Sequence, residues 1–133
     1  MTGAAVTGLG VVSALGEGAA TTLEALAAGV DGLRPIEHFD TSDAPFKLGG
    51  TVPGFEVRRP EAGLEFAERA AREALGAASG DQVGLIVGTS LGGAGGDLHQ
   101  STARLRARLG LRGPALTVST ACCSSTHAIG LGA

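Results

Sequence analysis

The chain has 133 residues, a formal net charge of −3 and a hydrophobic fraction of 44%, with 3% aromatic residues and 23 glycines. This length and apolar content predict one globular α/β domain with ample material for a buried core, in which helices pack closely on a sheet. The weak negative charge argues against a nucleic-acid partner. No apolar run approaches the ~20 residues that span a bilayer, and the start lacks the features of a signal peptide, so we expect a cytoplasmic protein without a membrane partner.

Cysteines and histidines restrict the site types that this sequence allows. Cys122 and Cys123 are neighbours in the sequence, which excludes a disulfide framework joining distant segments. The three histidines, His38, His99 and His127, have no short metal-ligand spacing. We therefore expect neither a metal site nor a bound cofactor.

The first half of the chain predicts a strand, two helices and a long connection. Residues 4–9 are typical of a short strand, and residues 19–28 of a helix that ends at a glycine. Residues 30–60 are rich in Gly, Pro, Asp, Ser and Thr, which indicates a long surface excursion with one strand near residues 48–52. Residues 64–78 place apolar side chains on one face and predict the clearest helix.

The second half predicts two strands that alternate with helices. Residues 83–87 form a continuous apolar run between glycines, typical of a strand buried on both faces. A Gly-rich turn at residues 88–96 leads to a helix at residues 98–109. A last strand at residues 115–119 runs through small residues into a helix over the remaining residues up to 133. This alternation predicts a layered α/β fold.

Four arginines gather on and after the helix at residues 98–109. They are Arg104, Arg106, Arg108 and Arg112. We interpret them as a solvated helix surface, because Arg104 and Arg108 stand one turn apart. A docking patch for an acidic carrier protein is the alternative.

Cys122 is the strongest candidate for chemistry. It lies where the predicted strand at residues 115–119 passes into a helix, so its thiol would face unpaired backbone N–H groups and the positive end of the helix dipole, which favour a thiolate. The same N–H groups would stabilise the oxyanion formed when a thioester carbonyl is attacked. From composition alone, the favoured interpretation is that both cysteines are inert buried side chains.

Several motifs, in order along the chain, resolve this choice. One motif is Thr120-Ala121-Cys122, which is followed by a Ser-rich helix start. The others are VTGLGVVS at residues 6–13, Leu15-Gly16, Phe39-Asp40, GTSLGG at residues 88–93 and GLRGP at residues 110–114. Together they resemble the N-terminal part of β-ketoacyl-acyl carrier protein synthases, condensing enzymes of the thiolase superfamily.

The resemblance implies a fold, a reaction and partners. The fold would be the N-terminal half of a thiolase-like layered α/β/α domain, with residues 1–133 forming an incomplete β-ketoacyl synthase N-terminal domain. Cys122 would take an acyl group from acyl carrier protein or a coenzyme A thioester, and a malonyl-carrier carbanion would then attack it in fatty acid or polyketide synthesis. Cys123 would pack as a variable small residue. The chain would form a homodimer through residues 115–119, or pair with a C-terminal half.

Departures from the family pattern matter equally. In the family, two histidines that drive decarboxylation, a supporting lysine and a second oxyanion-hole N–H come from the C-terminal half, which is absent here. We expect His127 to point to a different side from Cys122 and to have a structural role beside the core. Two connections, before residue 83 and between residues 93 and 110, are shorter than usual. An incomplete chain would also expose an apolar surface and self-associate.

Three other interpretations remain. Residues 88–92 satisfy the G-x-S-x-G pattern of a serine hydrolase with Ser90 as nucleophile and Asp97 and His99 downstream, although the following glycines disfavour the required helix. Residues 8–13 resemble a nicotinamide-binding fingerprint, but Ser13 replaces the third glycine. The third is a non-catalytic fragment or interaction module.

Overall fold

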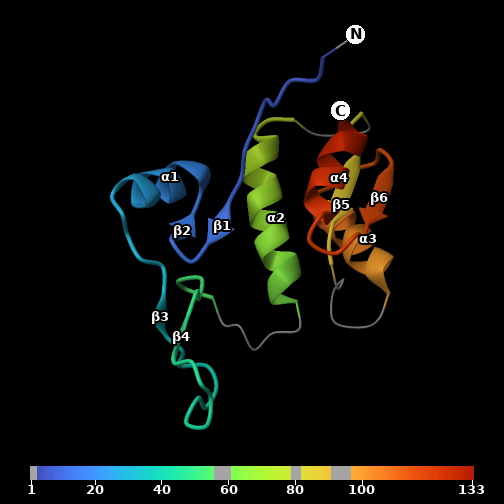
Figure 1. Ribbon diagram of the computed structural model, residues 1–133. Helices are drawn as coiled ribbons and strands as arrows, with labels where there is room; N and C mark the ends of the chain where they lie inside the picture. The colour runs from blue at the N-terminus through green and yellow to red at the C-terminus, as the bar shows by residue number, and fades with distance from the viewer. Residues whose placement is uncertain (1–2, 56–60, 79–81, 91–96) are drawn as a thin grey trace.

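The computed structural model describes residues 3–55, 61–78, 82–90 and 97–133. Figure 1 shows their arrangement. In chain order the elements are β1 (Val12–Ser13), β2 (Gly16–Glu17), α1 (Ala19–Ala27), β3 (Arg34–Pro35), β4 (Leu48–Gly49), α2 (Ala62–Leu75), β5 (Leu85–Gly88), α3 (Leu98–Arg108), β6 (Ala115–Val118) and α4 (Ser124–Gly132). Four helices and the last two strands match the predicted positions to within a few residues.

A parallel pair of strands, β5 and β6, forms the centre of the second half. The register runs from Leu85 opposite Ala115 to Gly88 opposite Val118. Ile86 and Gly88 face α4, whereas Val87 between them lines a pocket with α3. Because successive residues of a strand point to opposite faces, α3 and α4 cover opposite faces of the pair. This α/β/α layering confirms the predicted fold class.

Glycine is required where α4 meets β5. A Cβ atom at Gly88 would lie 2.6 Å from the carbonyl oxygen of Ser124 and 2.8 Å from the amide nitrogen of Ser125. Any side chain at Gly88 would therefore force the start of α4 away from the strand. The absence of a Cβ atom brings the first turn of α4 directly onto the end of β5.

Ion pairs join α2 to α3. Arg104 and Arg108 of α3 both bind the carboxylate of Glu61, the N-cap of α2. Arg108 also lies 3.3 Å from Glu68, which forms a 2.8 Å ion pair with Arg72 on its own helix. The interpretation of these arginines as a solvated helix surface was therefore incomplete. Arg104 and Arg108 are ion-paired within the chain, which weakens the alternative of a docking patch for an acidic carrier protein.

The Glu68 carboxylate makes folding sensitive to acid. Hydrogen bonding from Arg72, with a smaller contribution from Arg108, holds the pKa of Glu68 below its ordinary value of 4.5. Because the pKa is lower in the folded state, this stabilisation is complete above the unfolded-state value and is lost as the pH falls through the folded-state value. We expect Glu68→Gln to flatten the dependence of the urea midpoint on pH below about 5. An unchanged pH profile would contradict this assignment.

The predicted strand at residues 4–9 is wrong. These residues pair with no described strand, and the segment instead packs against α2, where Cβ atoms at Gly8 and Gly10 would lie 2.0 Å and 1.8 Å from the carbonyl oxygens of Ala74 and Ala70. Glycine lets the backbone approach the helix too closely for any side chain. This contact accounts for both glycines without a nicotinamide cofactor.

One carboxylate connects this segment to α1 and α2. Glu73 of α2 accepts hydrogen bonds from the amide of Val11, at 2.9 Å, and from the amide of Ala19, at 2.7 Å. Ala19 is the first residue of α1, whose N-terminal N–H groups have no partner within the helix. A single side chain therefore caps α1 and fixes the N-terminal segment to α2.

Residues 30–55 form the predicted excursion. Figure 1 shows them extending away from the helices, with β3 and β4 as an antiparallel pair. The strand expected near residues 48–52 is therefore confirmed as the short β4. Residues 56–60, the last part of the predicted excursion, lie outside the described residues.

The chain buries little of its apolar surface. Among the described residues, only two hydrophobic side chains are buried, those of Leu105 and Leu111. The expected ample core is therefore not formed. The total accessible area is 8950 Å², whereas a compact protein of 13.0 kDa exposes about 6,300 Å². Helix α1 turns Leu23 and Leu26 toward solvent, with exposed fractions of 67% and 62%.

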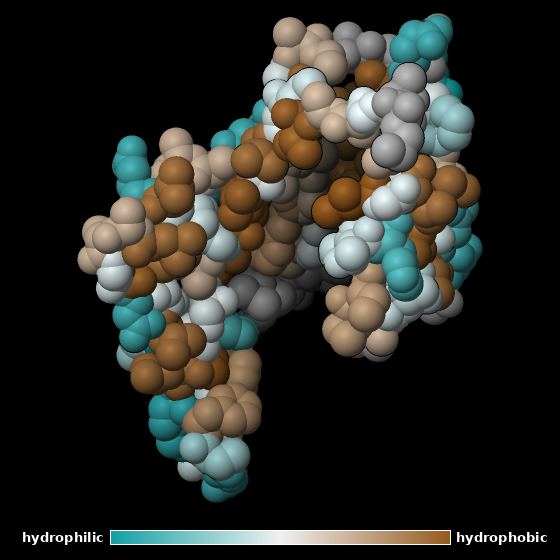
Figure 2. Space-filling view, turned by 45° about the horizontal axis from the view of Figure 1, so that its top comes forward, coloured by the Kyte–Doolittle hydropathy of each residue, from teal (hydrophilic) through white to brown (hydrophobic). Residues whose placement is uncertain are grey.

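Apolar side chains gather on one visible face of the molecule. Figure 2 shows them over α1 and the excursion, on one side of a central hollow. The expected exposed apolar surface is thus confirmed. Among the described helices, none has the length and apolar character that crossing a bilayer requires.

We expect this surface to bind a hydrophobic dye such as anilinonaphthalene sulfonate and to cause concentration-dependent self-association. The double substitution of Leu23→Lys and Leu26→Lys should lower both, with unchanged helical circular dichroism, because these side chains are 67% and 62% exposed in the fold. Ala20→Lys, at another exposed position of α1, is the matched control. A wild-type chain that stays monomeric without binding dye would contradict the prediction. Light scattering coupled to gel filtration measures the association.

Candidate active site

The two cysteines lie in the turn between β6 and α4. The strand ends at Val118 and the helix begins at Ser124, so residues 119–123 form the connection. The amide of Thr89, directly after β5, donates to the carbonyl of Val118 at 2.9 Å. The turn therefore sits at the carboxyl end of both parallel strands, as predicted from the sequence.

Ala121 gives the turn its sharp geometry. Its φ angle is +52°, which makes it the only non-glycine residue with a positive φ in the described part of the chain. For an L-residue this left-handed conformation costs roughly 1–2 kcal/mol. The surrounding hydrogen bonds must hold the residue in place, and such strain is concentrated at functional sites.

Ser124 holds this turn together. Its side chain is buried, and its hydroxyl accepts the amide hydrogen of Thr120 at 2.8 Å. The same hydroxyl is 2.7 Å from the carbonyl of Ala121 and 3.1 Å from the carbonyl of Thr89, so these two acceptors share its single proton. One buried hydroxyl thus connects both ends of the cysteine turn to the end of β5.

Both cysteine side chains are exposed as free thiols. This excludes the interpretation of two buried hydrophobic residues, and the prediction that Cys123 packs is wrong. Cys123 is the N-cap of α4, and its side chain makes no capping hydrogen bond. The turn presents its two thiols outward because Ser124, the next residue, takes the buried position.

Two backbone N–H groups of the turn are already paired. The amides of Cys123 and Ser124 donate to the carbonyls of Thr120 and Ala121, each at 3.2 Å. Within the described residues, the amide of Cys122 has no hydrogen-bond partner. Of these three donors, the amide of Cys122 is therefore the one available to a reacting carbonyl.

His127 lies closer to the turn than expected. Its Nδ1 atom is 2.8 Å from the hydroxyl of Thr120, and its side chain is exposed. Its exposure contradicts the expected place beside the core, whereas the contact with Thr120 agrees with a structural role. The helix begins at Ser124 instead of near Cys122, which places His127 in the first turn, and helical side chains lean toward the N-terminus.

The residues of the hydrolase interpretation are engaged elsewhere. Asp97 caps α3 by accepting the amide hydrogen of His99 at 2.9 Å, and His99 Nδ1 lies 2.9 Å from the Thr117 hydroxyl. The carbonyl of Ser90 accepts from Ser119, at 3.4 Å. The described contacts therefore join neither Asp97 nor His99 to Ser90. Residues 91–96, which include the last glycine of the pattern, lie outside the described residues.

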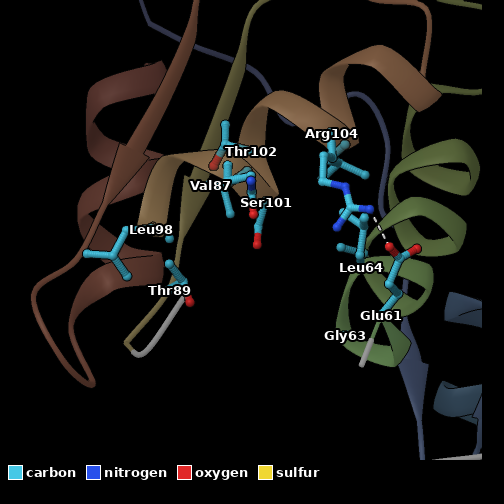
Figure 3. A pocket seen from close by; sticks show the side chains of 13 residues that line it. Glu61, Gly63, Leu64, Val87, Thr89, Leu98, Ser101, Thr102 and Arg104 are labelled. Carbon is cyan, nitrogen blue, oxygen red and sulfur yellow. Dashed lines mark hydrogen bonds and ion pairs between the residues drawn. The ribbon is translucent and has the colours of Figure 1, made fainter. Parts of the chain in front are cut away.

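A pocket of about 380 Å³ opens between α2 and α3, on the side of β5 away from α4. Figure 3 shows the ion pair of Glu61 and Arg104 at its wall. Thr102 is completely buried in the lining, with its hydroxyl 2.7 Å from that of Thr117. Sequence reasoning missed these residues, because scattered hydroxyl and aliphatic side chains carry no motif.

Metal-binding side chains are not clustered in this part of the molecule. Across the described ranges, no three His, Cys, Asp or Glu side chains come together in a way that could hold a metal ion.

The second half of the described chain is thus a layered α/β/α unit with an exposed cysteine in a strained strand-to-helix turn. Residues 100–133, which contain this turn, match the family model described as the N-terminal domain of β-ketoacyl synthase. Over these residues the chain is therefore similar to the N-terminal domain of β-ketoacyl synthases. This confirms the resemblance found in the sequence.

Relatives match nearly the whole chain. It is 26% identical to 3-oxoacyl-[acyl-carrier-protein] synthase 2 of Coxiella burnetii and 27% identical to that of Vibrio cholerae, in each case over 94% of this chain and 40% of the relative. The chain thus spans about two fifths of these relatives. The alignments cover 165 and 167 residues, more than the 133 of this chain, so the relatives contain segments that it lacks. This agrees with the shorter connections expected from the sequence.

Solved structures agree on the fold. A structure described as the ishigamide ketosynthase/chain length factor has a TM-score of 0.66 and 27% identity, and covers 86% of this chain and 39% of its own. The ketosynthase from module 6 of the Bacillus subtilis bacillaene synthase has a TM-score of 0.60 at 20% identity, covering 93% of this chain and 27% of its own. The thiolase-like fold class is therefore confirmed for the part that this chain represents.

We expect Ser124→Ala to destabilise the chain by about 1 kcal/mol, because it removes the buried hydroxyl that accepts from the amide of Thr120 and donates within the turn. The matched control is Ser125→Ala, at the next and exposed position, which should change stability by less than about 0.5 kcal/mol. Urea denaturation followed by circular dichroism measures both. Equal effects of the two substitutions would contradict the role given to Ser124.

Proposed function

We propose that Cys122 is the acyl-accepting nucleophile of a β-ketoacyl synthase-type acyltransferase. Its thiolate would attack the carbonyl of an acyl thioester, the carrier thiol would leave with a proton, and the acyl group would remain on the cysteine sulfur. A carbanion formed by decarboxylation of malonyl-acyl carrier protein would then attack this thioester. The product would be a β-ketoacyl carrier thioester in fatty acid or polyketide synthesis.

The observation that carries the proposal is the placement of Cys122 in a strained turn at a helix N-terminus. The side chain is exposed and free, and Ala121 directly before it has φ of +52°. The N-terminus of α4 carries partial positive charge from its unpaired N–H groups, which favours negative charge that develops on a bound acyl group. Thr120-Ala121-Cys122 also matches the family's nucleophile segment in order and spacing.

The amide of Cys122 supports a role in stabilising the oxyanion. In the described turn it has no hydrogen-bond partner, whereas the next two amides donate to carbonyl groups of the turn. An N–H group of the attacking residue lies close to the carbonyl carbon that its own side chain attacks. It can therefore donate to the developing oxyanion, which is the charge that most needs stabilisation.

His127 does not replace the family's decarboxylating histidines in this proposal. Its Nδ1 atom is occupied by the hydroxyl of Thr120, so it supports the turn instead of facing a substrate. Decarboxylation, in the family, depends on residues of the C-terminal half. Alone, the chain would accept an acyl group on Cys122, and full condensation would need those residues. Acyl carrier protein or a coenzyme A thioester would donate the acyl group.

Acylation tests the proposal directly. The wild-type chain is incubated with a short acyl-coenzyme A thioester and its intact mass is measured, beside Cys122→Ala and Cys123→Ala. We expect one acyl adduct on the wild type and on Cys123→Ala, and none on Cys122→Ala, because only the first thiol is the nucleophile. Circular dichroism verifies that each variant is folded.

Two outcomes would reject the assignment. If the adduct is lost only in Cys123→Ala, the nucleophile is Cys123 and not Cys122. No adduct on any folded form would favour a non-catalytic fragment or interaction module. A hydrolase using Ser90 would instead release free acid and keep this activity in Cys122→Ala. The engagement of His99 with Thr117 disfavours it.

A further inference from the structure

Cys123 has no role in the proposed acyl transfer, yet its thiol is exposed beside that of Cys122. No capping bond from its side chain to α4 is present. The turn therefore holds two adjacent, accessible thiols, one of which is the proposed nucleophile.

Adjacent cysteines can form a disulfide only under strain. Neighbouring Cα atoms are about 3.8 Å apart across a trans peptide bond, below the roughly 4.4–6.8 Å found in ordinary disulfides. A strained and exposed disulfide is easily reduced, which is typical of regulatory bonds and not of structural ones. Any bond between Cys122 and Cys123 should therefore be reversible in the presence of small thiols.

We propose that Cys122 and Cys123 form a peroxide-sensitive dithiol in which Cys123 is the resolving residue. The Cys122 thiolate attacks one oxygen of hydrogen peroxide, breaks the O–O bond and becomes a sulfenic acid, while the other oxygen leaves as hydroxide and takes up a proton to form water. The Cys123 sulfur then attacks the sulfenic sulfur, forming the S–S bond and releasing a second water. The two thiols lose two hydrogen atoms, and peroxide is reduced to two waters.

This modification would protect the site. A thiolate at a helix N-terminus and open to solvent is the kind that peroxide oxidises, and without a nearby thiol it proceeds to irreversible sulfinic acid. The disulfide stops this sequence and blocks acyl transfer until a reductant restores both thiols. The oxidation of the two thiols does not depend on the proposed function of Cys122, whereas its effect on acyl transfer does.

Intact-mass spectrometry of the full chain tests the proposal. The reduced protein is treated with hydrogen peroxide, remaining thiols are blocked with N-ethylmaleimide, and the mass is read before and after dithiothreitol. For the wild type we expect a monomer that has lost two hydrogen atoms and is restored by dithiothreitol. Cys123→Ser should instead gain first one and then two oxygen atoms, and the second gain should resist dithiothreitol.

Other results would overturn the proposal. One is that the wild type gains oxygen at the same rate as Cys123→Ser. The other is that peroxide joins two chains through a disulfide and forms no disulfide within a chain. Acylation of reduced and oxidised protein separates the two proposals. If the reduced form is acylated but peroxide produces no internal disulfide, only the proposed peroxide-sensitive dithiol is rejected. An internal disulfide in a chain that never accepts an acyl group rejects only the proposed nucleophile.

Discussion

The geometry of the candidate site depends on the buried hydroxyl of Ser124. It accepts from the amide of Thr120 and shares its proton between the carbonyls of Ala121 and Thr89. These contacts hold Ala121 in a left-handed conformation that an alanine would otherwise avoid. The strain at Ala121 and the exposure of both thiols follow from the turn that this hydroxyl stabilises.

Glycine sets the distances between the layers. Gly88 lets the first turn of α4 reach the end of β5, and Gly8 and Gly10 let the N-terminal segment reach the backbone of α2. The same composition limits the buried apolar volume. With few aromatic side chains and large aliphatic ones such as Leu23 facing outward, the described chain is held by backbone contacts and ion pairs more than by a hydrophobic core.

Sequence reasoning succeeded where a pattern was local. The apolar run that became β5 and the strand that leads to Cys122 were predicted closely, because buried strands and strand-to-helix junctions leave signatures within a few residues. The prediction failed at residues 4–9. The pattern predicted a strand, but this segment packs against helix α2 and pairs with no described strand. Cys123 was expected to pack because the resemblance implies a variable small residue there, but it precedes α4 and is exposed. His127 was expected beside the core, but α4 begins at Ser124 and places it in the exposed first turn.

The central claim is that the folded turn makes Cys122, and not its neighbour, the reactive thiol. The most direct test is the rate of iodoacetamide alkylation of each cysteine, determined by peptide mapping in the folded chain and again in denaturant. We predict that Cys122 reacts faster than Cys123 in the folded chain and that the two rates become similar after unfolding, because the difference arises from the turn. Equal rates in the folded chain, or a faster Cys123, would contradict the account.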